Sequence, residues 1–195
     1  MPEKTLSIYV VGPSSTGKTT LCNALAQRLG LQKPAYVTEI ARKVMRDKGY
    51  SRDTIGSLQM QQDIMEAYFE QEKMLDELGC CVRLFDRSAL DPVVYAILTS
   101  TDADDRRARK EFLLNSDKFR KVLARYRSDT SLVILLKPVS EWIHDDGVRS
   151  LENQQECGEI FEALLHELNI KYRVFGKGVK YLEERVTVVM GLAKL

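Results

Sequence analysis

The sequence predicts an α/β fold in which a mostly parallel sheet lies between two layers of helices. An apolar segment rich in β-branched residues, Leu6–Val11, precedes a glycine-rich loop, and leucines at helical spacing follow that loop. Further strand-like apolar segments alternate with amphipathic helical segments, and no tight hairpin signal joins any two of them. This alternation is typical of a parallel sheet that is covered on both faces. The predicted class is therefore a three-layer P-loop NTPase domain with a helical lid.

The glycine-rich loop fits the phosphate-binding pattern G-x-x-x-x-G-K-[ST] at every fixed position. It consists of Gly12, Pro13, Ser14, Ser15, Thr16, Gly17, Lys18, Thr19 and Thr20. Gly12 and Gly17 let the backbone turn its amides toward an anion, because neither residue carries a Cβ. Lys18 supplies a mobile charge to the β- and γ-phosphates, and the Thr19 hydroxyl can ligate Mg²⁺. The helix that starts near Lys18 also points its positive end at these phosphates, so the loop predicts a nucleotide site.

Length and composition indicate one ordinary globular domain spanning residues 1–195. Hydrophobic residues make up 44% of the chain, and the formal net charge is +1. This charge offers no strong field to attract nucleic acid, and no apolar run approaches the roughly 20 residues that span a membrane. The N-terminus lacks the apolar region of a signal peptide, so a cytoplasmic location is expected. The cysteines show no metal spacing and are expected to be reduced structural thiols; they are Cys22, Cys80, Cys81 and Cys157.

The first half of the chain predicts three strands and three helices. Strands are expected at 6–11, 35–37 and 81–85, and helices from near 18 to 29, at 38–48 and at 53–78. Glycines mark the ends of these helices, since Gly30, Gly49 and Gly79 each follow a helical apolar pattern. Glycine readily adopts the left-handed conformation in which many helices end.

The second half continues the same alternation. A helix is expected from Ser88 or Asp91 to Leu98, where Pro92 suits the first turn. The highly charged stretch 101–109 is predicted to be a solvated connection. Beyond it, strands are expected at 131–136 and 170–175, and helices around 119–126, at 159–168 and from 182 to 193. The clearest strand of the whole chain is 131–136.

Asp86 follows the predicted strand at 81–85. It would lie at the carboxyl edge of the sheet, where open α/β sheets bind their ligands. An apolar strand that ends in Asp suits a carboxylate that holds Mg²⁺ or its water. The run Asp86-Arg87-Ser88 also resembles the acidic-Arg-Ser run of nucleoside kinases, in which the acid deprotonates an acceptor hydroxyl. The sequence leaves both roles open, and the plainer alternative is a helix N-cap without chemistry.

Two further stretches carry candidate functional residues. A mobile lid of P-loop kinases would fall at about 139–158, where Arg149 could place a guanidinium on the transferring phosphoryl group. The alternative is a surface loop with an ordinary arginine. Glu39 and Arg42 lie one helical turn apart, so both side chains share a face. They either grip the hydroxyls of an acceptor or form an exposed ion pair.

Taken together, these stretches resemble the NadR-type nicotinamide riboside kinase domain and its relatives, small AAA-like ATPase and kinase domains linked to NAD metabolism. The resemblance covers nearly the whole chain. It rests on Gly12 to Thr19, Thr38 to Arg42, Phe85 to Ser88 with Asp91, and Leu135 to Lys137 followed by Glu141-Trp142 and Asp145 to Ser150. The phosphate loop is shared by many families, whereas the Glu-Trp…Asp-Asp-Gly-x-Arg-Ser stretch is much narrower. It strengthens the interpretation of Arg149 as a lid residue.

The resemblance implies roles for individual residues. Lys18, Asp86 and Arg149 would be catalytic, and Thr19 and Asp86 would hold the metal. The residues implied to face the acceptor are Glu39, Arg42, Arg87 and Asp91. The 195 residues are not expected to hold the adenylyltransferase domain of the bifunctional relative. The stretch 86–91 is closer to the broader ATPase branch, which leaves two alternatives open: an acceptor other than nicotinamide riboside, or no acceptor.

The leading functional hypothesis is an ATP- and Mg²⁺-dependent kinase that phosphorylates a hydroxyl of a small acceptor, such as a nucleoside. Its partners would be a nucleotide and the acceptor, with neither nucleic acid nor membrane, and the oligomeric state stays open. The alternative is an ATP-binding regulatory NTPase that signals through its lid. A conventional GTPase is not expected, because the stretch 136–139 reads Leu-Lys-Pro-Val where guanine-specific proteins carry [NT]-K-x-D.

Overall fold

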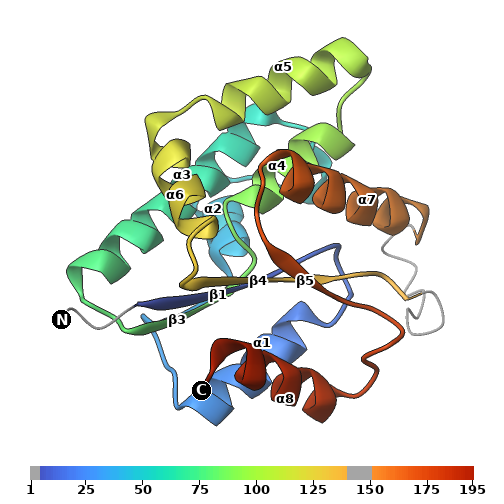
Figure 1. Ribbon diagram of the computed structural model, residues 1–195. Coiled ribbons are helices and arrows are strands. Elements are labelled where there is room, and N and C mark those ends of the chain that lie inside the picture. Colours follow the sequence, from blue (N-terminus) through green and yellow to red (C-terminus); the bar gives the residue numbers. More distant parts are fainter. Residues whose placement is uncertain (1–4, 140–150) are drawn as a thin grey trace.

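The computed structural model describes residues 5–139 and 151–195, and it shows a five-stranded sheet between two layers of helices (Figure 1). The strands are β1 (Leu6–Val11), β2 (Tyr36–Val37), β3 (Val82–Asp86), β4 (Ser131–Leu136) and β5 (Tyr172–Phe175). Their order in the sheet is β2-β3-β1-β4-β5, and each neighbouring pair is parallel. The predicted α/β class and mostly parallel sheet are confirmed.

The helices divide between the two faces of the sheet. They are α1 (Lys18–Leu29), α2 (Ile40–Lys48), α3 (Leu58–Glu77), α4 (Leu90–Leu98), α5 (Ala103–Leu114), α6 (Asp117–Tyr126), α7 (Leu151–Glu167) and α8 (Leu182–Ala193), with a 3₁₀ turn at Arg52–Thr54. Figure 1 shows α1 and α8 together below the sheet and the other layer above it. None of the described helices combines the length and apolar character that a membrane span requires.

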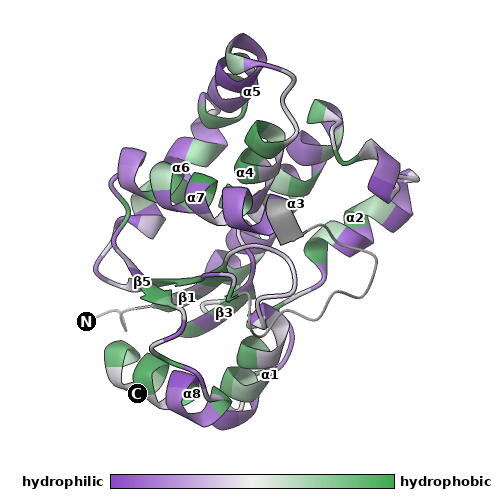
Figure 2. Ribbon diagram, turned by 90° about the vertical axis from the view of Figure 1, so that its right-hand side faces the viewer, coloured by the Kyte–Doolittle hydropathy of each residue, from purple (hydrophilic) through white to green (hydrophobic). Residues whose placement is uncertain are grey.

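The central strand β1 serves two hydrophobic cores. Side chains of a strand alternate between its faces, so Ile8 and Val10 pack toward α1 and α8, whereas Tyr9 and Val11 pack toward the other layer. All four side chains are essentially inaccessible to solvent. Figure 2 shows the hydrophobic colour of the strands between the two helical layers. Burial on both faces explains why this strand reads as a continuous apolar run.

The parallel register brings two loops together that are far apart in the sequence. Val10 of β1 lies opposite Asp86 of β3, at the carboxyl ends of both strands. The phosphate loop leaves β1 at this edge, and the segment after Asp86 leaves β3 beside it. The edge between β1 and β3 is therefore where a ligand site is expected in an open α/β sheet.

The stretch 101–109 is solvated as predicted, but the prediction of a connection was wrong, because α5 begins at Ala103. Asp102 caps the helix, and its side chain accepts hydrogen bonds from the backbone amides of Asp104 and Asp105. Arg109 and Asp105 form an ion pair at a spacing of four residues, with 2.8 Å between nitrogen and oxygen. Apart from the buried Leu113, this helix is largely solvated, which is why its apolar periodicity is weak.

Three other helix boundaries also differ from the sequence prediction. Helix α3 begins at Leu58 instead of residue 53, because the Ser57 side chain caps it by accepting from the Met60 amide. Helix α2 begins at Ile40 because Glu39 has a left-handed backbone with φ of 62°. Helix α7 already begins at Leu151, eight residues before the predicted start at 159.

A partly buried ionic network connects the central sheet to the helices α3 and α6. The Tyr9 hydroxyl donates to Glu72 at 2.7 Å, and Arg125 donates to the second oxygen of the same carboxylate. Arg125 also donates to Asp76 at 2.6 Å, and Asp76 accepts from the buried Arg83 at 2.7 Å. Burial raises the pKa of Glu72, although Arg125 acts in the opposite direction. The carboxylate of Glu72 therefore depends on its partners.

Replacing Arg125 by alanine is expected to destabilise the protein by about 3 kcal/mol, because Glu72 would remain buried without its counter-charge. Urea unfolding at neutral pH measures this loss. Arg120→Ala is the matched control on the same helix, since Arg120 pairs with the exposed Asp117 and with no other acidic residue that the structure describes. The control is expected to cost less than about 0.5 kcal/mol. Equal losses in the two variants would contradict a structural role of the network.

Candidate active site

The phosphate loop adopts a conformation that demands glycine at its first position. Gly12 has φ of 134°, and a Cβ built there would lie 2.4 Å from the carbonyl oxygen of Leu136. The loop therefore packs directly against the end of β4. Gly17 also has a left-handed backbone, with φ of 88°, and is the residue from which α1 starts. These two constraints give a physical reason for both glycines of the pattern.

Lys18 is buried at the base of the loop. Only 4% of the residue is exposed, and its Nζ donates to the carbonyl oxygen of Pro13. The Thr16 hydroxyl lies 3.4 Å from the same nitrogen. Burial, and then the nearby Arg87, lowers the pKa of Lys18 to about 7. An anion bound in the loop would stabilise the charged form of this lysine.

Thr19 and Asp86 meet at the edge between β1 and β3. The Thr19 hydroxyl donates to Oδ2 of Asp86 at 2.6 Å, and the Thr38 hydroxyl lies 3.5 Å from the same oxygen. Asp86 does not cap the next helix, because α4 begins at Leu90 with Ala89 as its cap. The N-cap interpretation of Asp86 is therefore wrong.

The second oxygen of Asp86 provides a test of the expected metal site. Oδ1 is buried and has no hydrogen-bond partner among the residues that the structure describes. An orphaned carboxylate oxygen beside a threonine hydroxyl fits Mg²⁺, which uses one or two carboxylates and completes its shell with phosphates and water. No cluster of three or more potential ligands from His, Cys, Asp and Glu occurs in the described part of the chain. The residues thus suit a metal that arrives with a nucleotide.

Arg87 and Asp91 form a buried pair directly after Asp86. The guanidinium of Arg87 donates to Asp91 at 2.9 Å, and the Ser88 amide donates to the other carboxylate oxygen at 2.8 Å. Burial raises the pKa of Asp91, while Arg87 and Lys18 oppose this shift. Burial also acts against the charge of Arg87, but Asp91 together with Tyr95 and Tyr68 outweighs it, and the pKa of Arg87 is raised. The pair holds a fixed positive group next to the predicted catalytic carboxylate.

A cavity of about 450 Å³ opens beside Thr19 and Asp86. All residues that the resemblance assigned to the acceptor line it; these are Glu39, Arg42, Arg87 and Asp91. Apolar and aromatic side chains from α2, α3 and α4 form much of the remaining wall; they include Ile40, Met45, Met60, Ile64, Tyr68, Pro92 and Tyr95. A volume of this size and a mixed lining are typical of small-molecule sites.

Several lining residues were not expected in the site from the sequence, among them Gln61, Tyr68 and Tyr95. Gln61 is only 2% exposed, and its amide nitrogen donates to the carbonyl of Ile55 at 2.8 Å. The Tyr68 hydroxyl donates to the backbone carbonyl of Asp86 at 3.4 Å, and the Tyr95 hydroxyl lies 3.1 Å from that of Ser14. Of these three residues, only Gln61 could have been recognised from the sequence, because it is a polar residue on the apolar stripe of α3. The tyrosines look like ordinary core residues in the sequence.

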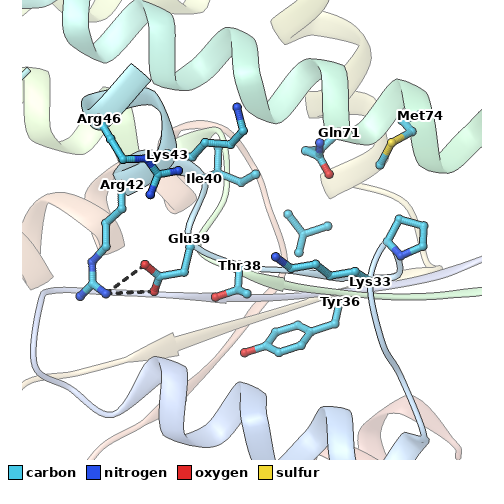
Figure 3. A pocket seen from close by; sticks show the side chains of 12 residues that line it. Lys33, Tyr36, Thr38, Glu39, Ile40, Arg42, Lys43, Arg46, Gln71 and Met74 are labelled. Carbon is cyan, nitrogen blue, oxygen red and sulfur yellow. Dashed lines mark hydrogen bonds and ion pairs between the residues drawn. The ribbon is translucent and has the colours of Figure 1, made fainter. Parts of the chain in front are cut away.

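Glu39 and Arg42 form an exposed ion pair, which is one of the two alternatives that their spacing left open. Arg42 donates to both oxygens of Glu39, at 2.9 and 3.2 Å, as the dashed lines in Figure 3 show. Their side chains are 46% and 74% exposed. An ion pair with this exposure contributes little to stability. The pair nevertheless lines the cavity, so its predicted contact with an acceptor stays a prediction.

The lid is only partly within the described residues. Arg149 lies outside them, as does most of the predicted lid at 139–158. Helix α7, which follows, packs on the phosphate loop: a Cβ at Gly158 would lie 3.3 Å from Pro138 and 3.7 Å from Pro13. On the opposite side of the loop, the guanidinium of Arg185 lies 3.6 Å from a Cβ built on Gly17. No feature of the sequence indicated this position of Arg185.

Comparisons with known proteins agree with the geometry. A family model of an AAA domain matches residues 7–185. The sequence matches no curated protein. A crystal structure of NadR protein in complex with NAD and AMP-PNP is similar to 98% of this chain, with a TM-score of 0.71 and 20% sequence identity. This chain spans about half the length of that protein, because 50% of it is covered.

Other solved structures share the fold over their whole length. The structure of deoxyadenosine kinase from M. mycoides with bound dCTP has a TM-score of 0.64 and 17% identity to this chain. The match covers 97% of this chain and 100% of that chain. Thymidylate kinase from Ehrlichia chaffeensis follows with a TM-score of 0.59 and 12% identity, over 97% of this chain and 98% of that chain. These similarities establish a P-loop kinase fold and confirm the fold-level resemblance to NadR.

Replacing Lys18 by methionine is expected to stabilise the nucleotide-free protein while it abolishes triphosphate binding. The pKa of Lys18 is about 7 in the folded protein and has the ordinary value of 10.5 in the unfolded chain. The unfolded state therefore binds more protons between these values, and wild-type stability rises with pH across that window. The gain of Lys18→Met should be roughly 1–3 kcal/mol at pH 6.5 and should shrink at pH 9.5.

Denaturant unfolding at both pH values, with calorimetric titration of ATP, measures these effects. Lys121→Met is a suitable control, because Lys121 is exposed on α6 and far from the loop in sequence. This control should change neither stability nor nucleotide binding. A stability difference for Lys18→Met that does not vary with pH would show that the burial of its charge is not the cause.

Proposed function

Because the chain belongs to the AAA domain family, we propose that it is an ATP- and Mg²⁺-dependent kinase that transfers the γ-phosphoryl group to a hydroxyl of a small acceptor. The observation that carries this proposal is the position of Asp86. It accepts a hydrogen bond from Thr19 of the phosphate loop and also lines a separate cavity of about 450 Å³. A nucleotide site that merely hydrolyses ATP needs no such second cavity beside its carboxylate.

Each of these residues has a task in the proposed reaction. The amides of the phosphate loop and Lys18 bind the phosphate chain, and bound phosphate keeps the lysine charged. Mg²⁺, when held by Thr19 and Asp86, neutralises negative charge on the phosphates. Asp86 faces the cavity and is the candidate to take the proton from the acceptor hydroxyl. Arg149 is the candidate lid residue for the charge of the transferring group.

The lining of the cavity supports a nucleoside as the acceptor. Tyr68, Tyr95 and the neighbouring apolar side chains suit a flat heterocyclic base. Gln61 donates its amide nitrogen to Ile55, so its carbonyl oxygen is the group left to meet a ligand. Such an acceptor oxygen favours a base with an N–H donor, such as a carboxamide or an exocyclic amine. One similar structure is a NadR protein in complex with NR, and another is a deoxyadenosine kinase, which is consistent with this class.

The proposal is tested by measuring ADP release from ATP with a panel of nucleosides that includes nicotinamide riboside and deoxyadenosine. At least one nucleoside is expected to raise ADP release about 100-fold or more above the rate without acceptor. Asp86→Asn should keep nucleotide binding but lower transfer by about 10²–10⁴-fold, as loss of a general base does. Asp129→Asn, at an exposed surface ion pair, should behave like the wild type. ATP hydrolysis that no acceptor accelerates would instead favour a regulatory NTPase.

The proposed role of Gln61 predicts a preference within matched pairs of acceptors. The protein should prefer nicotinamide riboside over nicotinic acid riboside, or adenosine over purine riboside, because only the first member of each pair offers the N–H donor. Gln61→Leu should lower kcat/KM for the preferred member by about 10–100-fold and leave ATP affinity unchanged. Gln59→Leu is the control, since Gln59 is exposed and bonds Asp63 on the outer side of α3. A preference that survives in Gln61→Leu would contradict this role.

A further inference from the structure

A second cavity lies outside the active site, between β2, α2 and α3 (Figure 3). Its volume is about 480 Å³, and residues 33–46 form most of it together with Gln71 and Met74 of α3. It contains neither the phosphate loop nor Asp86 among its lining residues. Its size lies in the range of small-molecule sites. The reaction proposed above has no use for this cavity.

The charges of this cavity favour an anion. Four cationic side chains line it, from Lys33, Arg42, Lys43 and Arg46, whereas Glu39 is the only acidic residue in the lining. Arg42 is neutralised by Glu39, and Lys43 and Arg46 share the carboxylate of Asp47 at 2.5 and 3.6 Å. Lys33 has no ion pair or hydrogen bond among the described residues, and Figure 3 shows its side chain extending across the cavity. The cluster therefore retains unbalanced positive charge.

The rest of the lining favours a ligand with an apolar or aromatic body. Tyr36, Ile40 and Met74 contribute apolar surface, and Figure 3 shows Met74 and Gln71 reaching down from α3 toward Tyr36. The Tyr36 hydroxyl donates to Asn23 at 2.8 Å, which holds its ring in place. A bare anion such as inorganic phosphate would leave this apolar surface unused. The combination suits an anion that is attached to an apolar group.

The two cavities share a wall. Glu39, Ile40 and Arg42 line both of them, so the start of α2 separates the second cavity from the proposed acceptor cavity. Glu39 has a left-handed backbone, with φ of 62°, which is uncommon for a residue other than glycine. Its neighbour Thr38 also lines the second cavity, and the Thr38 hydroxyl lies 3.5 Å from Asp86. A ligand that shifts this segment would also shift groups of the active site.

We propose that the second cavity is an effector site for a small phosphate monoester with an apolar or aromatic body, and that the segment 38–42 couples it to the active site. A phosphate monoester is close to a dianion at neutral pH. It therefore matches a cluster of several cations better than a ligand with a single carboxylate would. Coupling through a shared wall is reciprocal: the effector and the nucleotide alter each other's affinity by the same factor. The site does not depend on the kinase reaction.

Calorimetric titration of phenyl phosphate into the protein saturated with Mg²⁺ and AMP-PNP tests the site, because the nucleotide occupies the phosphate loop. One equivalent is expected to bind, and Lys33→Glu should weaken this binding at least about tenfold. Lys121→Glu carries the same change of charge on the exposed face of α6 and should leave the affinity unchanged. Benzyl alcohol, which lacks the phosphate, should not bind.

Two results would overturn the site: an absence of saturable binding, or binding that Lys33→Glu and Lys121→Glu affect equally. The coupling is tested separately by titrating AMP-PNP with Mg²⁺ in the presence and absence of saturating phenyl phosphate. A change of at least about fivefold is expected in the wild type and should vanish in Lys33→Glu. An unchanged nucleotide affinity would overturn the coupling. Competition for the phosphate loop itself would persist in Lys33→Glu and is thereby distinguished.

Discussion

The parallel pairing of β1 with β3 is the constraint on which the site depends. The hydrogen bond between Thr19 and Asp86 forms only because of this pairing. The pairing sets Val10 opposite Asp86, so the phosphate loop and the segment after β3 emerge side by side. Without this register the Thr19 hydroxyl would lack its partner at 2.6 Å, and the cavity beside Asp86 would lack its floor. A one-residue slip would turn Asp86 to the opposite face of the sheet.

The site concentrates charge that burial disfavours. Lys18 and Asp91 both have pKa values shifted toward their neutral forms, mainly because they are removed from water. Bound phosphate would relieve the cost for Lys18, and Arg87 already offsets part of it for Asp91. The free-energy cost of these buried charges requires a stable scaffold around the site. The two hydrophobic cores and the network around Glu72 and Arg125 supply that stability, and they lie on the elements that carry the site.

Much of the fold was predictable because its signals are local. The strand of β1, the glycine turns after α1 and α2, and the long amphipathic α3 all follow from patterns within a few residues. The errors have physical causes too. Helix α5 is mostly solvated, so its charges rather than an apolar stripe define it. The start of α2 was misjudged because the left-handed conformation of Glu39 is not encoded by a glycine.

The sequence by itself determined the phosphate loop, the carboxylate at the end of β3 and the order of the elements, because each depends on neighbouring residues. Only the tertiary structure decided that Gln61, Tyr68 and Tyr95 share one cavity with Asp86, since they come from α3 and α4 whereas Asp86 ends β3. It also decided that residues 38–42 form a wall between two cavities. The shape of a cavity depends on distances between elements that are remote in the chain, and no local pattern records such distances.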